Sequence, residues 1–167
     1  WIVAGDAFQT EPELMGNIVE RASKYAFPLY TINPIHPSID FGWHNNEGKY
    51  DVNVARRADI NCSSLKNLMF EIDGIPLDDQ LELLFRSGIP WTAIVFSGNK
   101  SYHAILSLED NLGQPHTEEG IEQYKQVWKR LAALINAEYA GKIVSLKEGV
   151  LDEATKNPSR FTRFPNY

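Results

Sequence analysis

The chain has 167 residues, of which 43% are hydrophobic and 23% charged, and its formal net charge is −6. This length predicts one domain with a substantial core and room for an appended subdomain. No apolar run is long enough to span a bilayer, and the acidic balance argues against a surface that coats nucleic acid generally. A locally basic cleft and carboxylates that bind metal ions both remain compatible with this charge.

The number of cysteines indicates the redox environment of the protein. A single cysteine, Cys62, excludes an internal disulfide framework and a zinc site built from several cysteines. We therefore expect a reducing, intracellular environment and a structural role for Cys62. The chain begins at Trp1 rather than Met, which indicates a piece of a longer protein from which a targeting signal would be missing.

The first third of the chain predicts an α/β arrangement with a long irregular segment. Residues 11–25 predict a helix, because their apolar positions recur with helical spacing, and residues 27–32 predict a strand. Residues 33–53 are rich in Pro, Gly and Asn and predict an irregular excursion. This excursion contains His36 and His44, which we interpret as surface or locally capped residues rather than as a metal-binding pair.

From residue 67 onward, the spacing of apolar residues and turn residues predicts the secondary structure more clearly. Short apolar runs bounded by turn residues predict strands, and two longer stretches with apolar residues at helical spacing predict helices. In chain order we expect a strand over 68–72, a helix over 76–86, strands over 91–96 and 104–108, a helix over 119–139, and short extended segments over 150–151 and 160–164.

This order of elements predicts an α+β fold of the RRM-like, or ferredoxin-like, type. Its plan is β-α-β-β-α-β, with four antiparallel strands in one sheet and both helices on one face. The first and third strands lie side by side in the middle of such a sheet. Glu71 and Asp73 on the first strand should therefore face His103 on the third. Because strand side chains alternate with period two, both carboxylates should point to the same side of the sheet.

Two carboxylates so placed predict a metal site. Glu71 and Asp73 would lie within about 7 Å of each other, and their repulsion is costly unless a cation compensates it. Carboxylate oxygens suit Mg²⁺ or Mn²⁺. A third carboxylate is best supplied by Asp152 at the mouth of the last strand, with Glu153 as its competitor. The alternative is that these acids lie on a solvated sheet face.

The turn between the two central predicted strands is suited to an anion. A Gly-Asn pair between two β-rich runs is typical of a hairpin, since both residues tolerate positive φ. Small hydroxyls, backbone N–H groups and cationic side chains then gather at one tip, where they favour a phosphate chain. The residues concerned are Ser97, Gly98, Asn99, Lys100, Ser101 and His103. The alternative is a solvated polar hairpin with a surface histidine.

Two arginines near the end of the chain are further candidates for phosphate binding. Arg160 and Arg163 are three residues apart, so in an extended segment they should point to opposite faces. We therefore expect one of them to reach the site unless the strand bulges there, with Arg160 favoured over Arg163. The alternative is that both pair with the surplus acids.

Three segments together resemble the motifs of archaeo-eukaryotic primases, the primase-polymerase superfamily. They are F-E-I-D at 70–73, S-G-N-K-S-Y-H at 97–103 and L-D-E-A-T-K-N-P-S-R-F-T-R-F-P at 151–165. The likeness is to the plasmid, phage and mobile-element branch and covers about residues 67–167. Two features depart from the family pattern: Glu71 stands where Asp is commoner, and the expected Ser-x-His spacing is met by Ser101 rather than by Ser97.

This resemblance implies template-directed nucleotidyl transfer from NTP or dNTP, in a primase or DNA polymerase. Glu71, Asp73 and Asp152 would hold two divalent ions, Mg²⁺ or Mn²⁺, that activate a 3′-hydroxyl and steady the leaving pyrophosphate. His103 would be a donor to the triphosphate rather than a general base. It would act with Ser97, Lys100, Ser101, Arg160 and Arg163.

The resemblance also implies an organisation and a set of partners. Residues 1–66 would form a small N-terminal α/β module of the same catalytic domain, and residues 67–167 the RRM-like catalytic module. The partners would be a single-stranded DNA template, a primer strand and a helicase in the same or a partner chain, with no membrane involved. The protein would be cytoplasmic and encoded by a bacterium, phage or plasmid.

Three alternatives compete with nucleotidyl transfer. The segment K-S-Y-H-A-I-L-S at 100–107 has some likeness to the RRM signature, so the chain would then be a non-catalytic RNA-binding module. It lacks the later stacking aromatics of that signature, and acids on the first strand would repel RNA. A two-metal nuclease would use the same carboxylates but has no need of a hairpin that binds triphosphate. A degenerate relative that serves as a scaffold is the third alternative.

Overall fold

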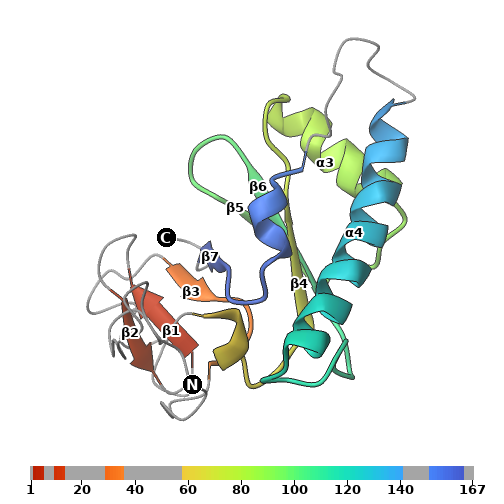
Figure 1. Ribbon diagram of the computed structural model, residues 1–167. Coiled ribbons are helices and arrows are strands. Elements are labelled where there is room, and N and C mark those ends of the chain that lie inside the picture. Colours follow the sequence, from red (N-terminus) through yellow and green to blue (C-terminus); the bar gives the residue numbers. More distant parts are fainter. Residues whose placement is uncertain (1, 6–9, 14–28, 36–57, 141–150, 164–167) are drawn as a thin grey trace.

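The structure is a computed structural model, and it describes residues 2–5, 10–13, 29–35, 58–140 and 151–163. The described part is an α+β arrangement of two antiparallel sheets and two long helices, which confirms the predicted class (Figure 1). The strands are β1 (Ile2–Gly5), β2 (Thr10–Glu13), β3 (Leu29–Thr31), β4 (Asn67–Glu71), β5 (Ala93–Phe96), β6 (Tyr102–Ser107) and β7 (Phe161–Arg163). The helices are α3 (Leu77–Arg86) and α4 (Glu118–Ala140), with short 3-10 helices η1 (Asp59–Asn61) and η2 (Glu153–Lys156).

The central sheet has the strand order β4-β6-β5, with antiparallel pairing throughout. The elements predicted from residue 67 to the end of α4 are confirmed to within two residues at each end. The predicted register is confirmed as well, because Glu71 on β4 is the direct partner of His103 on β6. In the part of the chain described, neither helix is long and apolar enough to cross a membrane.

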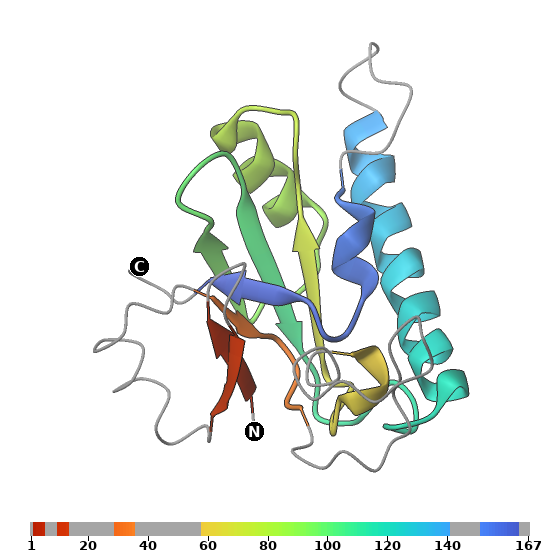
Figure 2. The ribbon, with the colours of Figure 1, turned by 60° about the vertical axis from the view of Figure 1, so that its left-hand side comes forward.

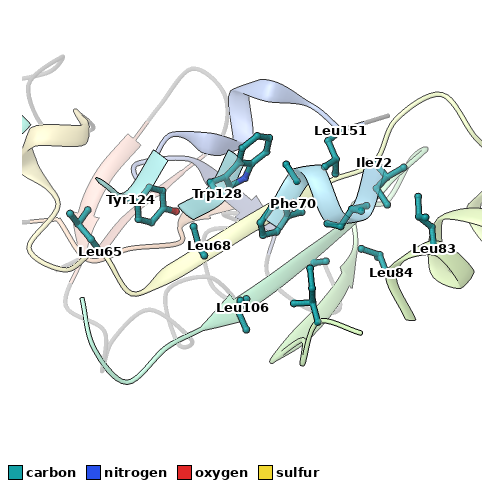
Figure 3. Packing of buried hydrophobic residues seen from close by; sticks show 14 of the residues in the cluster. Leu65, Leu68, Phe70, Ile72, Leu83, Leu84, Leu106, Tyr124, Trp128 and Leu151 are labelled. Carbon is teal, nitrogen blue, oxygen red and sulfur yellow. The ribbon is translucent and has the colours of Figure 1, made fainter. Parts of the chain in front are cut away.

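Both helices cover one face of the central sheet, as predicted (Figure 1). The core lies between the helices and the sheet. There the ring of Phe70 stacks on Trp128 with centroids 5.3 Å apart and meets Trp91 edge-on with centroids 5.5 Å apart. Leu84 and Leu106 belong to the same cluster, in which α3 and α4 pack against β4 and β6 (Figure 3). Alternation along the strands sends the neighbouring side chains to the other face.

The second face of the central sheet is turned toward the N-terminal strands. Met69, Val95 and Ile105 form a small apolar cluster there with Ile32, which follows β3. Figure 2 shows β3 and β7 on this side of the sheet, away from the two helices. Glu71 and His103 belong to the same face, since they lie two residues from Met69 and Ile105 along their strands. The candidate site therefore opens between the two sheets.

The predicted segment 160–164 is wrong as the fourth strand of the central sheet, and the predicted segment 150–151 is described at Leu151 alone. Residues 161–163 form β7, but β7 pairs with β3, and among the described residues the free edge of β4 carries one bridge, between Ile72 and Leu151. The outer carbonyls of β4 are satisfied otherwise: Tyr124 Oη donates to Asn67 O at 2.7 Å, and Trp128 Nε1 to Met69 O at 2.8 Å. Because side chains of α4 occupy this edge at Asn67 and Met69, a strand cannot pair along that part of β4.

The remaining strands form a second sheet with the order β2-β1-β3-β7. The helix predicted over 11–25 is wrong at its beginning, because Thr10–Glu13 is strand β2 paired with β1. Pro12 is tolerated there because β2 is the outer strand of the sheet. The rest of that predicted helix lies outside the described residues.

The strand predicted over 27–32 is confirmed as the shorter β3. Most of the excursion over 33–53, with His36 and His44, lies outside the described residues. Since β7 joins the N-terminal sheet, the parts of the chain before and after residue 66 share one sheet. The module boundary at 66 stays a prediction.

Candidate functional site

A polar pocket of about 400 Å³ lies between the central sheet, the β5–β6 turn and β7. It is lined by Leu29, Glu71, Ser97, Asn99, Lys100, Ser101, His103, Arg160, Phe161 and Arg163. The structure therefore brings together most of the residues predicted for the site. Asp73 and Asp152 are neighbours of this pocket and not part of its lining.

Glu71 and His103 form the floor of the pocket. Their side chains are 15% and 8% exposed, and Glu71 Oε1 lies 3.6 Å from His103 Nε2. Ser101 Oγ donates a hydrogen bond of 2.6 Å to the same carboxylate oxygen. The facing His103, the Ser101 hydroxyl and the field of Arg160 lower the pKa of Glu71 to about 2, although burial opposes the shift. The acid is therefore ionised at neutral pH.

The imidazole of His103 is held from its other side by the second sheet. Its Nδ1 lies 3.0 Å from Oγ1 of Thr162 on β7, and both residues are buried. A carboxylate in front of Nε2 favours a proton on that nitrogen, so Nδ1 accepts from the Thr162 hydroxyl when the ring is neutral. The sequence reasoning missed Thr162; its signal was its position between the two predicted arginines.

Asp73 lies just beyond the end of β4, under the Lys100 side chain. Lys100 Nζ is 3.1 Å from Asp73 Oδ1. This oxygen is buried and accepts no hydrogen bond, so its contact with Lys100 is an ion pair without hydrogen-bond geometry. The Lys100 side chain is 66% exposed. A buried carboxylate oxygen that accepts no hydrogen bond and has one exposed cation nearby can be compensated further by a second cation.

Asp152 reaches the same end of β4 but has both carboxylate oxygens occupied. Its backbone N–H donates to Glu71 O at 2.9 Å. Its Oδ1 caps η2 by accepting from Ala154 N, and its Oδ2 lies 3.0 Å from Arg160 Nη2. Glu153, the competing prediction, is exposed and pairs with Lys156, which lowers its pKa. Among the described residues, no three His, Cys, Asp or Glu side chains are grouped so that they could hold a metal ion.

Both arginines line the pocket, so the expectation that only one would do so is wrong. Arg160 lies in the turn before β7, where its N–H bonds to Asn157 O, and strand alternation does not apply there. The Arg163 guanidinium lies over the β5–β6 turn: a Cβ added to Gly98 would be 3.7 Å from Arg163 Cζ. Gly98 has a φ of 84°, a conformation that favours glycine.

The charge of this pocket is opposite in sign to that of the whole chain. Arg160 pairs with Asp152 and Lys100 with Asp73. In contrast, Arg163 has no carboxylate partner among the described residues. A chain with a net charge of −6 thus carries a local cluster of cations and hydroxyls around one ionised glutamate. Such a cluster suits a polyanion such as a phosphate chain.

Comparison with known proteins identifies the fold. No family model and no curated protein matches the sequence. The structure, however, has the fold of an archaeo-eukaryotic primase (AEP) domain. It superposes on the AEP domain of the cyanophage S-2L primase-polymerase (PrimPol) with a TM-score of 0.55, covering 97% of this chain and 70% of that one. The two sequences are 16% identical, so the likeness concerns the fold.

Proposed function

We propose that this chain is the catalytic domain of a primase-polymerase, which transfers nucleotides from NTP or dNTP to a 3′-hydroxyl on a single-stranded DNA template. The observation that carries the proposal is the pocket in which cations and hydroxyls surround Glu71 and His103. The AEP fold supports the same conclusion. The proposal implies a template strand and a primer strand as partners, with a helicase in the same or another chain. The protein would be cytoplasmic and encoded on a mobile element.

In this proposal the triphosphate occupies the pocket over the β5–β6 turn. His103 Nε2, Lys100, Arg160 and Arg163 donate to its oxygens, because charge-assisted hydrogen bonds are the strongest available to phosphate. Arg163 is the first of these to engage, since no described carboxylate competes for it. Lys100 and Arg160 turn from Asp73 and Asp152 toward the phosphates.

The carboxylates have the donor chemistry of a magnesium or manganese site. Mg²⁺ is commonly bound by one or two carboxylates together with substrate phosphates and several waters, so its site need not contain three preformed protein ligands. The buried Asp73 Oδ1, which accepts no hydrogen bond, fits this requirement. Asp73 and Glu71 would hold the ions with Asp152. When bound, divalent ions would lower the pKa of the attacking hydroxyl and neutralise the triphosphate.

Nucleotide binding in the presence of Mn²⁺ or Mg²⁺ tests the proposal. The native chain is compared with Asp73→Ala and His103→Ala, and with Asp110→Ala as a control at an exposed loop acid outside the pocket. We expect metal-dependent binding of ATP or dATP that both site variants abolish and the control retains. Primer synthesis and primer extension assays then follow.

Two outcomes would contradict the proposal in different ways. A native chain that binds single-stranded RNA but no triphosphate would be an RRM-like binding module. A native chain that degrades a DNA strand with the metal alone, and does not extend a primer, would be a two-metal nuclease.

A further inference from the structure

We propose that Gln80 is a positioning residue of this site, whose carboxamide fixes the loop that carries Asp73 against the turn that carries Lys100 and Ser101. The inference rests on the proposed function for its effect on nucleotide binding. Its structural part rests on contacts of the described residues alone. Gln80 belongs to α3, on the far side of the central sheet from the pocket, so it does not touch the substrate itself.

The carboxamide of Gln80 is completely buried and uses both of its chemical ends. Nε2 donates to Ile75 O at 2.9 Å and to Lys100 O at 2.8 Å. Oε1 accepts from Tyr102 N at 3.0 Å. One side chain therefore forms hydrogen bonds, with its two donors and one acceptor, to three backbone groups in two separate loops. Among side chains of this size, only the amide of glutamine offers two N–H donors and an acceptor together.

These bonds determine the position of Ser101. Gln80 holds the carbonyl of the residue before Ser101 and the N–H of the residue after it. The backbone of Ser101 is held by Ser97, whose Oγ accepts from Ser101 N at 3.2 Å and whose N donates to Ser101 O at 2.8 Å. With its backbone fixed, Ser101 directs its hydroxyl at Glu71.

The same carboxamide sets the distance between Asp73 and Lys100. Ile75, whose carbonyl Gln80 binds, lies two residues after Asp73 in the loop that follows β4. The Lys100 carbonyl is bound by the same nitrogen, and the side chains of Lys100 and Asp73 meet at 3.1 Å. Loss of the carboxamide would leave three partly buried backbone groups without this partner, and the two loops would separate to hydrate them.

Three variants separate positioning from ordinary packing. Gln80→Met preserves the length of the side chain but removes all three hydrogen bonds. Gln80→Glu keeps an acceptor for Tyr102 N–H but cannot donate to Ile75 O and Lys100 O together, because a carboxyl group has at most one O–H and a carboxylate has none. Leu83→Ala removes a buried side chain of the same helix and serves as the control for a general loss of stability.

Amide hydrogen exchange reads the hydrogen bonds directly. In each variant, the exchange rate of the Tyr102 amide is compared with that of the β4 amides of the same protein. We expect this relative rate to be at least tenfold higher in Gln80→Met than in Leu83→Ala. In Gln80→Glu we expect the Tyr102 amide to stay protected. Equal protection of Tyr102 in all three variants would overturn the proposal. If Gln80→Met fails to fold, Gln80→Glu still tests the proposal. Loss of protection of the Tyr102 amide in that variant would contradict the assignment of the side-chain oxygen at position 80 as its acceptor.

Titration with ATP and Mn²⁺ then tests the consequence for binding. We expect at least tenfold weaker binding in both Gln80 variants and near-native binding in Leu83→Ala. Native affinity in the Gln80 variants would show that Gln80 only packs. If the native chain itself binds no triphosphate, the proposed function fails, and the exchange pattern alone decides whether Gln80 holds the two loops.

Discussion

Thr162 and His103 lie on different sheets and meet through a hydrogen-bonding distance of 3.0 Å between the hydroxyl Oγ1 and the imidazole Nδ1. The three-residue strand β7 therefore does more than extend the N-terminal sheet. It presents a buried hydroxyl to the ring that forms the floor of the pocket, and it carries Arg163 at its end. Changes in β7 should therefore alter the proposed nucleotide site.

The substitution Thr162→Val should weaken triphosphate binding about tenfold, because it removes one buried hydrogen bond at nearly constant volume. The imidazole would lose the partner of Nδ1 and with it a defined orientation of Nε2. Thr162→Ser, which keeps the hydroxyl, should bind nearly as the native chain does. Titration of both variants with ATP and Mn²⁺ checks this, and equal affinities would show that Thr162 does not orient His103.

Acid should destabilise the fold through Glu71. Its pKa is lowered from 4.5 to about 2 in the folded chain, so its stabilising contribution is present above about pH 4.5 and is lost as the pH falls toward 2. The part lost is up to about 3 kcal/mol. Urea unfolding at a series of pH values should show a shallower acid dependence for Glu71→Gln than for the native chain. Parallel curves would contradict the assigned interaction.

Removal of Arg163 should weaken triphosphate binding by about ten- to a hundredfold, since it would contribute charge-assisted hydrogen bonds. The native affinity should also fall with added salt more steeply than that of Arg163→Ala. Arg86→Ala is a matched control, because Arg86 lies on the surface of α3 and pairs with Glu82. Titrations at low and high salt measure both effects, and an unchanged salt dependence would place the phosphates elsewhere.

Asn33 should be among the residues most important for stability. It is buried, its Oδ1 accepts from Lys66 N and Asn67 N, and its Nδ2 donates to Asn67 O and Pro158 O. Asn33→Ala would leave the partly buried N–H groups of Lys66 and Asn67 and the buried Pro158 carbonyl without this partner, at a cost of about 3 kcal/mol or more. Urea denaturation of this variant measures the loss, with Gln123→Ala on the exposed side of α4 as the control. If the free energy of unfolding falls no more than it does in the control, water replaces the hydrogen bonds of the amide.

Much of the central sheet could be predicted from the sequence because its signals are local. Apolar runs separated by a Gly-Asn turn placed β5 and β6 next to each other, and the register that follows brought His103 opposite Glu71. The β7–β3 pairing could not be predicted, because two three-residue strands more than a hundred positions apart carry no local pattern. The partners of Asp152 and Gln80 also depend on backbone groups, which a sequence pattern does not reveal.

The indole and phenol groups of α4 that occupy the outer carbonyls of β4 have a consequence for the behaviour of the protein in concentrated solution. An open row of strand carbonyls is a template on which another chain can add a strand, and such edges promote aggregation. Trp128 and Tyr124 interrupt that row at alternate residues with side-chain donors that have no strand geometry. The central sheet is thereby protected from intermolecular growth on this side by two residues that also fill its core.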